Sequence, residues 1–194
     1  MTRLVLLRHG MTDWNRDGRL QGQADPPLNE TGREQARRAA ELLAPGNCRA
    51  VYSSDLKRAL ETASVVADRL KVPIHIDRRL REIHQGQWEG LLVEEVRRRF
   101  PGEWAAREKE PQTFPIPGGE AVADVAARMR AVANEIAARH AQETVIVVAH
   151  GLSLATLLCL AQGISIGQAP LHIPANAEPV EAEWPPAGAT GRRR

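Results

Sequence analysis

Short apolar runs alternate with longer amphipathic segments along this chain, and the alternation predicts an α/β fold. The runs are rich in leucine, valine and isoleucine, which is typical of buried strands. The predicted strands are residues 3–7, 50–52, 74–76, 144–149 and 176–183. Between them, apolar residues recur at the spacing of one helix face, which predicts helices over about 30–43, 54–70, 91–100, 120–140 and 152–162. We therefore expect a three-layer α/β/α sandwich with a mostly parallel central sheet.

Polar residues and prolines mark where these elements begin and end. Asn29 is a typical N-cap for the helix that begins at about residue 30, and Ser53 or Ser54 is expected to cap the next helix. Residues 101–119 hold four prolines and three glycines, so they are predicted to form a loop over the surface.

Length and composition fit a single domain with an ordinary core, because the chain has 194 residues of which 43% are hydrophobic. The domain is expected to cover residues 1–183, with residues 84–119 as a lid or cap and residues 184–194 as a loose tail. Two cysteines are too few for a disulfide framework or a zinc ribbon.

The charge of the chain argues against nucleic acid as a partner. Basic residues number 26 and acidic residues 24, but three arginines end the chain, so the remainder carries 23 basic against 24 acidic residues. A nucleic-acid-binding face would need basic residues clustered on the folded body. No apolar stretch approaches the roughly 20 residues that span a bilayer. The N-terminus also lacks a signal-peptide pattern, so we expect a cytoplasmic protein that does not bind membranes.

Two histidines directly follow two of the predicted strands. His9 comes after residues 3–7 and His150 after residues 144–149, and each is followed by a glycine. In an open parallel sheet, reacting groups gather beyond the carboxyl ends of the strands, so we expect the two imidazoles to be neighbours. This placement indicates a site built around imidazole chemistry.

Arginines and a carboxylate are expected at the same edge of the sheet. Arg8 and Arg58 follow the first two strands, and the third strand is followed by Arg81, Glu82 and His84. Arginines that converge in a partly closed pocket repel one another unless an anion lies between them. Guanidinium groups match phosphoryl oxygens in pairs, and histidine can act as a covalent nucleophile. Each residue alone is more often a core or surface residue than a catalyst, but together they predict a phosphate pocket.

A metal site with His9, His150 and Glu82 as ligands is the main alternative at this edge. Arginines close to these ligands would repel a metal ion, so we expect no metal. The sequence contains neither the glycine pattern of a dinucleotide-binding turn nor a G-x-x-x-x-G-K-[ST] phosphate loop, so no nucleotide cofactor is expected.

Five segments, in order, resemble the motifs of the histidine phosphatase superfamily, which has the phosphoglycerate-mutase-like fold. They are LRHGMTDWN at 7–15, LNETGREQA at 28–36, SSDLKRA at 53–59, LREIHQGQWEG at 80–90 and VAHG at 148–151. The resemblance covers about residues 3–162. The ordered set is far more specific than any one motif.

The resemblance implies a role for each matching residue, and no cofactor. His9 would accept the phosphoryl group as phosphohistidine, and Glu82 would protonate the leaving oxygen and then take a proton from the attacking water. The clamp on the phosphoryl oxygens would consist of Arg8, Arg58 and His150. Further contacts to phosphate or substrate would come from Asn15, Gln21, Gly22 and Gly151.

The spacing of the motifs favours a phosphatase over a mutase. Mutases of the superfamily carry an arginine-bearing insertion between the acid and the second histidine, whereas 67 residues separate Glu82 from His150 here. The run Arg97-Arg98-Arg99 in that interval lies on a charged predicted helix and is more typical of a solvated face. The sequence therefore predicts a metal-independent phosphomonoesterase that acts on small phosphorylated metabolites and most resembles the broad-specificity and α-ribazole-phosphatase-like members.

Two other functions stay open on the sequence alone. A cofactor-dependent phosphoglycerate mutase would exchange phosphoryl groups faster than it releases phosphate. A non-catalytic phospholigand-binding module would keep the pocket without turnover, but such a module has no use for a proton donor at Glu82. The expected partner is a small phosphorylated substrate, whose identity the sequence does not define. The oligomeric state is also open, with a homodimer among the options.

Overall fold

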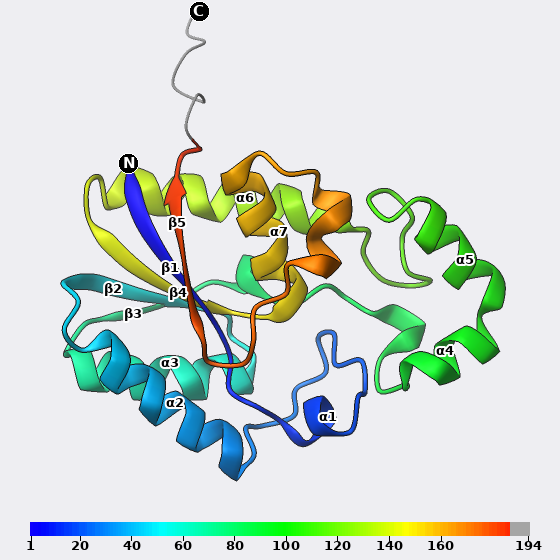
Figure 1. The fold of residues 1–194 in the computed structure, drawn as a ribbon, viewed down its shortest axis with the longest axis horizontal. Coiled ribbons are helices and arrows are strands. Elements are labelled where there is room, and N and C mark those ends of the chain that lie inside the picture. The colour runs from blue at the N-terminus through cyan, green and yellow to red at the C-terminus, as the bar shows by residue number, and fades with distance from the viewer. Residues whose placement is uncertain (187–194) are drawn as a thin grey trace, which may run out of the picture.

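Five strands form one sheet in the order β3-β2-β4-β1-β5 in the computed structural model, which describes residues 1–186 (Figure 1). The strands are β1 (Thr2–Arg8), β2 (Cys48–Ser53), β3 (Ile74–Ile76), β4 (Thr144–Ala149) and β5 (Pro179–Trp184). Strand β5 runs antiparallel to β1, and the other neighbouring pairs are parallel. The prediction of a mostly parallel central sheet is confirmed.

Helices cover both faces of this sheet, as the three-layer prediction requires. In the described residues the α-helices are α1 (Asp13–Arg16), α2 (Glu30–Leu43), α3 (Lys57–Leu70), α4 (Val93–Arg99), α5 (Pro101–Lys109), α6 (Val122–Arg139) and α7 (Gly151–Gln162). Short 3-10 helices lie at Arg78–Leu80, Gly86–Trp88 and Ile166–Leu171. In Figure 1, α2 and α3 lie below the sheet, and α6 and α7 lie above it.

Successive residues of β1, an interior strand of the sheet, face two separate hydrophobic cores. In β1, Leu4 and Leu6 belong to the core that includes α6 and α7, whereas Val5 and Leu7 belong to the core that includes α2 and α3. All four side chains are buried, which explains why the strand appears in the sequence as a continuous apolar run. This buried strand presents His9 at its carboxyl end.

The two helix-cap predictions had different outcomes. Asn29 caps α2 as predicted, because its side-chain oxygen accepts a backbone N–H of the first turn at 2.9 Å. The prediction for α3 was wrong, because Leu56 occupies the N-cap position and makes no side-chain cap. Ser53 instead donates its hydroxyl to the Ser54 carbonyl, and the Ser54 hydroxyl accepts the Leu56 N–H.

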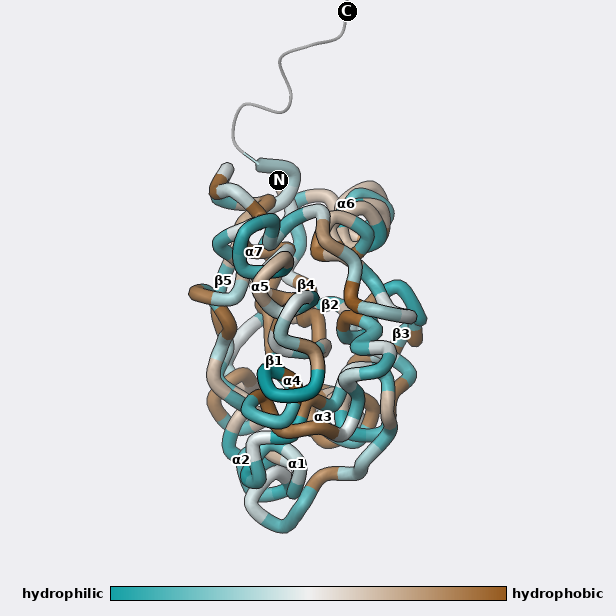
Figure 2. The backbone as a smooth tube through the Cα atoms, turned by 90° about the vertical axis from the view of Figure 1, so that its right-hand side faces the viewer, coloured by the Kyte–Doolittle hydropathy of each residue, from teal (hydrophilic) through white to brown (hydrophobic). Residues whose placement is uncertain are grey.

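The prediction of a loop over residues 101–119 was wrong in its first half. Helix α5 begins at Pro101, because proline has a helical φ angle and its missing N–H is not needed in the first turn. Trp104 stacks on the buried Trp88, with 5.9 Å between the ring centroids, and fixes α5 to the body of the protein. Helices α4 and α5 form an arm, which stands in front of the strands in Figure 2.

The last strand begins three residues later and ends one residue later than the sequence predicted. Trp184 ends β5, is buried, and donates its indole N–H to Asn134 at 2.8 Å. Trp184 therefore belongs to the sheet and not to the tail in which we expected it. Residues 187–194 of that predicted tail lie outside the described residues. None of the described helices is long and apolar enough to cross a membrane.

Candidate active site

A cavity of about 410 Å³ lies between the carboxyl ends of the strands and the arm formed by α4 and α5. Its volume is typical of a small-molecule site. The predicted site residues that line it are Arg8, His9, Asn15, Gln21, Gly22, Arg58, Glu82 and Gly151. His150 lies behind this wall, with its ring centroid 5.2 Å from that of His9. The structure thus brings together all of the predicted site residues.

His9 is buried, and its hydrogen bonds define which ring nitrogen carries the proton. Nδ1 lies 2.7 Å from the Gly10 carbonyl oxygen, which can only accept, so Nδ1 bears the hydrogen. Nε2 accepts from Nε of Arg58 at 3.2 Å and therefore carries a lone pair. Burial lowers the pKa of His9 well below 6.5, and the charges of Arg58 and Arg8 lower it further. The hydrogen bond to the Gly10 carbonyl acts in the opposite direction and raises the pKa. His9 is therefore a neutral imidazole with its lone pair on Nε2.

Arg58 is buried, and its guanidinium group is held in one orientation. Nη1 donates to the Ala24 carbonyl at 2.7 Å and Nη2 to the Gly22 carbonyl at 2.8 Å, which directs Nε to His9. Gly22 has a φ of +51°, and a Cβ there would lie 2.4 Å from Glu89 Oε1, so this loop requires glycine. Burial lowers the pKa of Arg58 to about 10, so the group still carries its positive charge at neutral pH.

Arg8 is a second, largely buried cation in the site. Nη1 donates to the Pro174 carbonyl at 3.0 Å, while Nε is buried and has no hydrogen-bond partner among the described residues. Burial lowers the pKa of Arg8, and the charge of Glu82 opposes this effect. A buried donor without an acceptor is costly, so Arg8 is prepared to bind an anion.

His150, like Arg8, has buried nitrogen atoms without hydrogen-bond partners in the described part of the chain, and a ligand could provide them. Both of its ring nitrogens are buried, and neither has a hydrogen-bond partner among the described residues. Burial lowers the pKa of His150 well below 6.5, and the charge of Arg58 acts in the same direction. An anion beside the ring would accept an N–H and favour the protonated form. This geometry suits a side chain that holds phosphate.

Asn15 and Gln21 add neutral donors to the cavity wall. Asn15 Oδ1 accepts the Thr12 N–H at 3.1 Å, and Gln21 Oε1 lies 3.1 Å from the Thr12 hydroxyl. With both amide oxygens engaged by Thr12, the two NH2 groups are left to serve a ligand. Donors of this kind complement an anion with several oxygens.

Glu82 has its carboxylate at the N-terminus of α7. Oε1 accepts the backbone N–H groups of Ile83 and Ser153, and Oε2 accepts that of Leu152 at 3.0 Å. Because Oε2 has fewer hydrogen bonds than Oε1, it is the oxygen better able to exchange a proton with a ligand. A carboxyl group fixed in this way on the wall of a phosphate pocket suits general acid and base catalysis.

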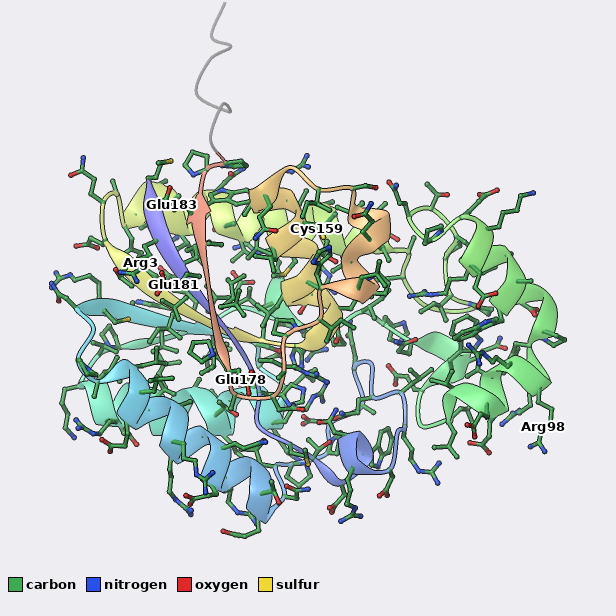
Figure 3. The ribbon with its side chains drawn as sticks, in the orientation of Figure 1. Arg3, Arg98, Cys159, Glu178, Glu181 and Glu183 are labelled. Carbon is green, nitrogen blue, oxygen red and sulfur yellow. The ribbon has the colours of Figure 1, made fainter. Side chains whose placement is uncertain are left out.

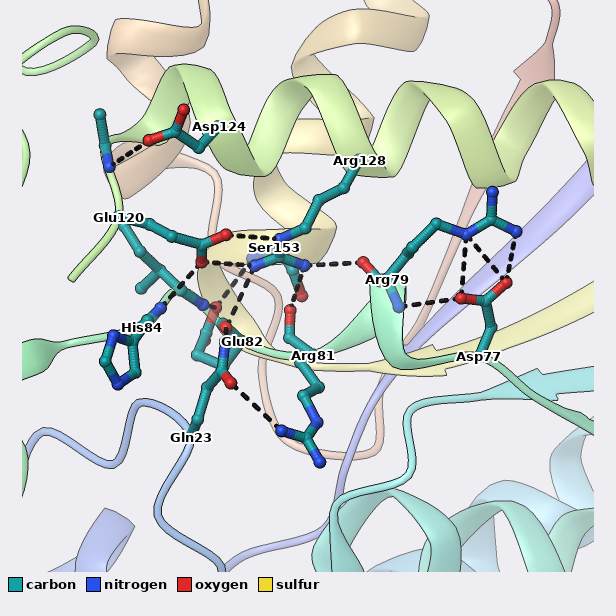
Figure 4. Close-up of polar contacts among 12 residues, drawn as sticks. Gln23, Asp77, Arg79, Arg81, Glu82, His84, Glu120, Asp124, Arg128 and Ser153 are labelled. Atoms are coloured by element: carbon teal, nitrogen blue, oxygen red, sulfur yellow. Dashed lines mark hydrogen bonds and ion pairs between the residues drawn. The ribbon is translucent and has the colours of Figure 1, made fainter.

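Arg128 of α6 braces the backbone segment that carries Glu82 (Figure 4). Its Nη1 donates to the carbonyls of Arg79 and Arg81, at 2.7 and 2.5 Å, and its Nη2 donates to that of Glu82 at 3.1 Å. Arg128 also pairs with Glu120, which accepts the backbone N–H two residues after Glu82. Arg128 does not line the cavity, so it positions Glu82 from behind.

Arg81 and His84, which we also expected at this edge, do not line the cavity. Arg81 forms an ion pair with Asp55 at 2.6 Å, and His84 contributes its backbone N–H to the network around Arg128. The run Arg97-Arg98-Arg99 is exposed, and Arg98 points away from the body of the molecule in Figure 3. The interpretation of this run as a solvated face is confirmed.

Two residues of the site, Asn176 and Arg107, were missed in the sequence. Asn176 donates to the His9 carbonyl at 2.8 Å and so ties the segment before β5 to the end of β1. Arg107 and Trp104 line the cavity from α5, the helix that was not predicted. The one local signal for that helix is Pro101 at its first position, whereas nothing near Asn176 in the sequence indicated its contact.

Among the described residues, no group of three His, Cys, Asp or Glu side chains is arranged to hold a metal ion. His9, His150 and Glu82 therefore do not form the metal site that the sequence left as an alternative. The donor set instead consists of guanidinium, imidazole and amide groups, which together are suited to the oxygens of a phosphoryl group.

Comparisons with known proteins agree with this geometry. Residues 4–193 match the sequence profile of the histidine phosphatase superfamily (branch 1). Phosphoserine phosphatase 1 of Hydrogenobacter thermophilus is 35% identical over 168 residues, which are 87% of this chain and 80% of the relative. Glucosyl-3-phosphoglycerate phosphatase of Mycobacterium tuberculosis is 38% identical over an alignment of 197 positions, which covers 97% of this chain and 81% of the relative. The solved structure of the mycobacterial glucosyl-3-phosphoglycerate phosphatase with VO3 has a TM-score of 0.83 at 38% identity, covering 92% and 90%.

The fold and the cavity together define an α/β enzyme that acts on phosphoryl groups. The chain belongs to the histidine phosphatase superfamily. It is a phosphatase of small phosphorylated metabolites, as the motifs predicted.

Proposed function

We propose that the protein hydrolyses phosphomonoesters through a phosphohistidine formed on His9, with no metal ion taking part. The observation that carries this proposal is the state of His9. Its ring is neutral, its Nδ1–H is fixed on the Gly10 carbonyl, and its Nε2 lone pair lies beside the positive charge of Arg58. A nucleophile in this state needs no base to activate it.

In the first half of the reaction, Nε2 of His9 gives up the hydrogen bond from Arg58 Nε and attacks phosphorus, and the bond from phosphorus to the ester oxygen breaks. Glu82, protonated at the start of this step, gives its proton to the departing oxygen. Arg8 and Arg58 stabilise the charge on the oxygens that stay with phosphorus. Phosphoryl transfer depends mainly on such positioning and charge stabilisation.

In the second half, a water oxygen attacks phosphorus and the bond from phosphorus to Nε2 breaks. Glu82, now a carboxylate, takes the proton of that water and returns to its starting form. The Gly10 carbonyl stays bound to Nδ1–H throughout and stabilises the positive charge that the ring acquires when Nε2 is phosphorylated. Phosphate then leaves, and the site is ready for another substrate.

The test is hydrolysis of p-nitrophenyl phosphate in excess chelator by the full-length protein and by His9→Asn, which keeps a polar side chain of smaller size. We expect turnover by the protein as isolated and a loss of about a thousandfold or more in the variant, because no other described group replaces the nucleophile. The matched control is His75→Asn, which changes an exposed histidine on β3. Comparable activity in His9→Asn, or loss of activity on chelation, would refute the proposal.

The cytoplasmic location and the homodimer stay predictions from the sequence, as does the lack of nucleic-acid or membrane binding.

A further inference from the structure

One of the five superfamily motifs has no part in the site as described so far. In the described part of the chain, residues of the other four line the cavity, whereas LNETGREQA at 28–36 contributes none. This motif forms the start of α2, and its Gln35 contacts the turn that follows β1. The side-chain oxygen of Gln35 accepts the backbone N–H of Met11 at 2.8 Å. The motif therefore reaches the residues directly after the nucleophile.

The Met11 N–H belongs to the same peptide group as the Gly10 carbonyl. That carbonyl oxygen lies 2.7 Å from Nδ1 of His9 and accepts its hydrogen. One chain of hydrogen bonds thus runs from the His9 imidazole through the Gly10–Met11 peptide to the Gln35 side chain. Hydrogen bonds in such a chain polarise one another, so an acceptor on the N–H increases the negative charge on the carbonyl oxygen. Gln35 therefore makes the Gly10 carbonyl a stronger acceptor for His9.

The turn after β1 lies directly on the first turn of α2, which is why Gln35 can reach it. A Cβ at Gly10 would lie 2.3 Å from the Gly32 carbonyl oxygen, and a Cβ at Gly32 would lie 2.1 Å from the Met11 carbonyl oxygen. Only glycine at both positions allows the two backbones to approach so closely. Gln35 comes three residues after Gly32 and so lies on the same side of the helix.

Other contacts hold the neighbouring peptide groups of this turn. The Asn29 N–H donates to the Met11 carbonyl at 3.0 Å, and the Thr62 hydroxyl accepts the Gly10 N–H at 3.0 Å. These two bonds fix the peptides before and after the one whose carbonyl faces the nucleophile. The turn is thus held in place from α2 and α3 by bonds that do not involve Gln35. The contribution of Gln35 is then mainly to the charge on the carbonyl.

We propose that Gln35 is a positioning residue that stabilises the phosphohistidine intermediate through the Gly10–Met11 peptide. This inference rests on the proposed reaction, in which Nε2 bonds to phosphorus while Nδ1 keeps its hydrogen. The ring gains positive charge in that step, so its hydrogen bond to the polarised carbonyl becomes charge-assisted and stronger. When water displaces Nε2 from phosphorus, the ring becomes neutral again and this stabilisation is lost.

The two halves of the reaction should therefore respond differently when the acceptor is removed. Gln35→Met keeps the length of the side chain without its amide oxygen. Both steps are measured in the Glu82→Gln background, in which the phosphoenzyme should accumulate after p-nitrophenol leaves. First-turnover release of p-nitrophenol should slow by roughly 2- to 10-fold, within the net value of one hydrogen bond, with little change in the substrate concentration that gives half the maximal rate. Hydrolysis of the phosphoenzyme should not slow, because the ring loses its charge in that step.

A spectroscopic measurement tests the chain of hydrogen bonds without any turnover. In the protein labelled with isotopic histidine, the hydrogen on Nδ1 of His9 should give a low-field proton resonance, which is assigned by its absence in His9→Asn. Gln35→Met should move this resonance to higher field. Gln35→Glu retains an acceptor, so its resonance should stay in place or move to lower field, and its first-turnover rate should be retained.

The matched control is Arg37→Met, which introduces the same side chain at an exposed position of α2. Arg37 pairs with Glu34 at 2.8 Å and is not bonded to the turn after β1 in the described structure. A surface ion pair of this kind contributes little to stability. The His9 resonance and both rates should therefore match those of the parent protein, and circular dichroism shows that each variant has folded.

Three results would overturn the inference or its basis. If the His9 resonance does not move in folded Gln35→Met, the peptide is not polarised by Gln35, and the inference fails while the phosphatase reaction stands. If Gln35→Met slows both halves equally, or Gln35→Glu loses as much as Gln35→Met, then Gln35 only supports the structure of the turn. If no phosphoenzyme forms in Glu82→Gln with Gln35 in place, the proposed function itself fails.

Discussion

The burial of His9 and the guanidinium groups of Arg8 and Arg58 together keep His9 in the form that can attack phosphorus. Burial lowers the pKa of His9 and the charges of Arg58 and Arg8 lower it further, so the Nε2 lone pair is available at neutral pH. The same two groups leave the pocket with uncompensated buried charge, which makes binding of an anion favourable. The two guanidinium groups therefore contribute both to the activation of the nucleophile and to the recognition of phosphate.

The neutral state of the buried imidazoles has a consequence for the pH dependence of stability. Folding lowers the pKa of both His9 and His150 below 6.5, so the unfolded chain binds more protons in the window beneath that value. The free energy of unfolding should thus fall as the pH is lowered from about 7 to about 5, with a slope that approaches about 1.4 kcal/mol per pH unit for each histidine once the pH is well below 6.5. Urea unfolding at several pH values measures this slope.

The slope of the unfolding free energy against pH should depend on a buried histidine and not on an exposed one. His150→Asn should show a shallower slope than the unmodified protein, because one buried imidazole no longer has to accept a proton. His75→Asn, on an exposed part of β3, should leave the slope unchanged. Equal slopes in all three proteins would show that burial does not hold His150 neutral.

Glu82→Gln separates the two halves of the reaction. The amide cannot give or take a proton, so the protein should release one equivalent of p-nitrophenol rapidly and then turn over slowly. With an alkyl phosphate, whose oxygen needs a proton to leave, the first step should itself slow by about 100- to 10,000-fold. Rapid-mixing kinetics with both substrates checks this, and an unchanged steady-state rate would remove Glu82 from the mechanism.

At the scale of elements, the ends of strands and helices position the side chains of the active site. Strand β1 presents Arg8 and His9, and α7 both follows His150 and fixes Glu82 through its first backbone N–H groups. Helix α6 contributes Arg128, which holds the backbone around Glu82 from the opposite side. The acid is thus located by two helices, although it lies on neither.

Arg128→Ala removes one of these supports without touching the cavity. We expect stability to fall by about 1–3 kcal/mol, because three backbone carbonyls and Glu120 lose their donor. For an alkyl phosphate kcat should fall with little change in KM, whereas the rate of p-nitrophenol release in the first turnover should be largely kept, because Arg128 acts through Glu82. Arg128→Lys should recover part of kcat.

Arg130→Ala, an exposed neighbour on α6, serves as the control and should behave like the unmodified protein. An equal loss on both substrates in Arg128→Ala would indicate a general effect on folding instead of a positioning role.

The elements and residues that the sequence predicted have clear local signals, whereas those that it missed have an ambiguous signal or none. The end of each buried strand is marked where the apolar run stops, and so His9 and His150 could be placed together. Helix α5 was missed because proline and glycine at its start are also the residues of a loop. Arg107 was missed with it. Asn176 contacts His9 across 167 residues of sequence, a distance over which no local pattern acts.

At the scale of the whole molecule, the site joins the first strand of the chain to its last third. The Pro174 carbonyl accepts from Arg8, and Asn176 donates to the carbonyl of His9, so the segment before β5 closes around the end of β1. Pro170 and Ile173 also line the cavity. They lie beyond the five superfamily motifs that were identified in the sequence. The pocket is therefore complete only when the entire described chain has folded.

The most direct test is to locate the phosphoryl group on the enzyme. Glu82→Gln is mixed with p-nitrophenyl phosphate, quenched in alkali to preserve phosphohistidine, digested, and analysed by mass spectrometry. We predict one phosphoryl group on Nε2 of His9, and none when His9→Asn is combined with the same change. A phosphoryl group on another residue, or steady hydrolysis with no phosphorylated enzyme in either protein, would contradict the central claim that His9 is the nucleophile.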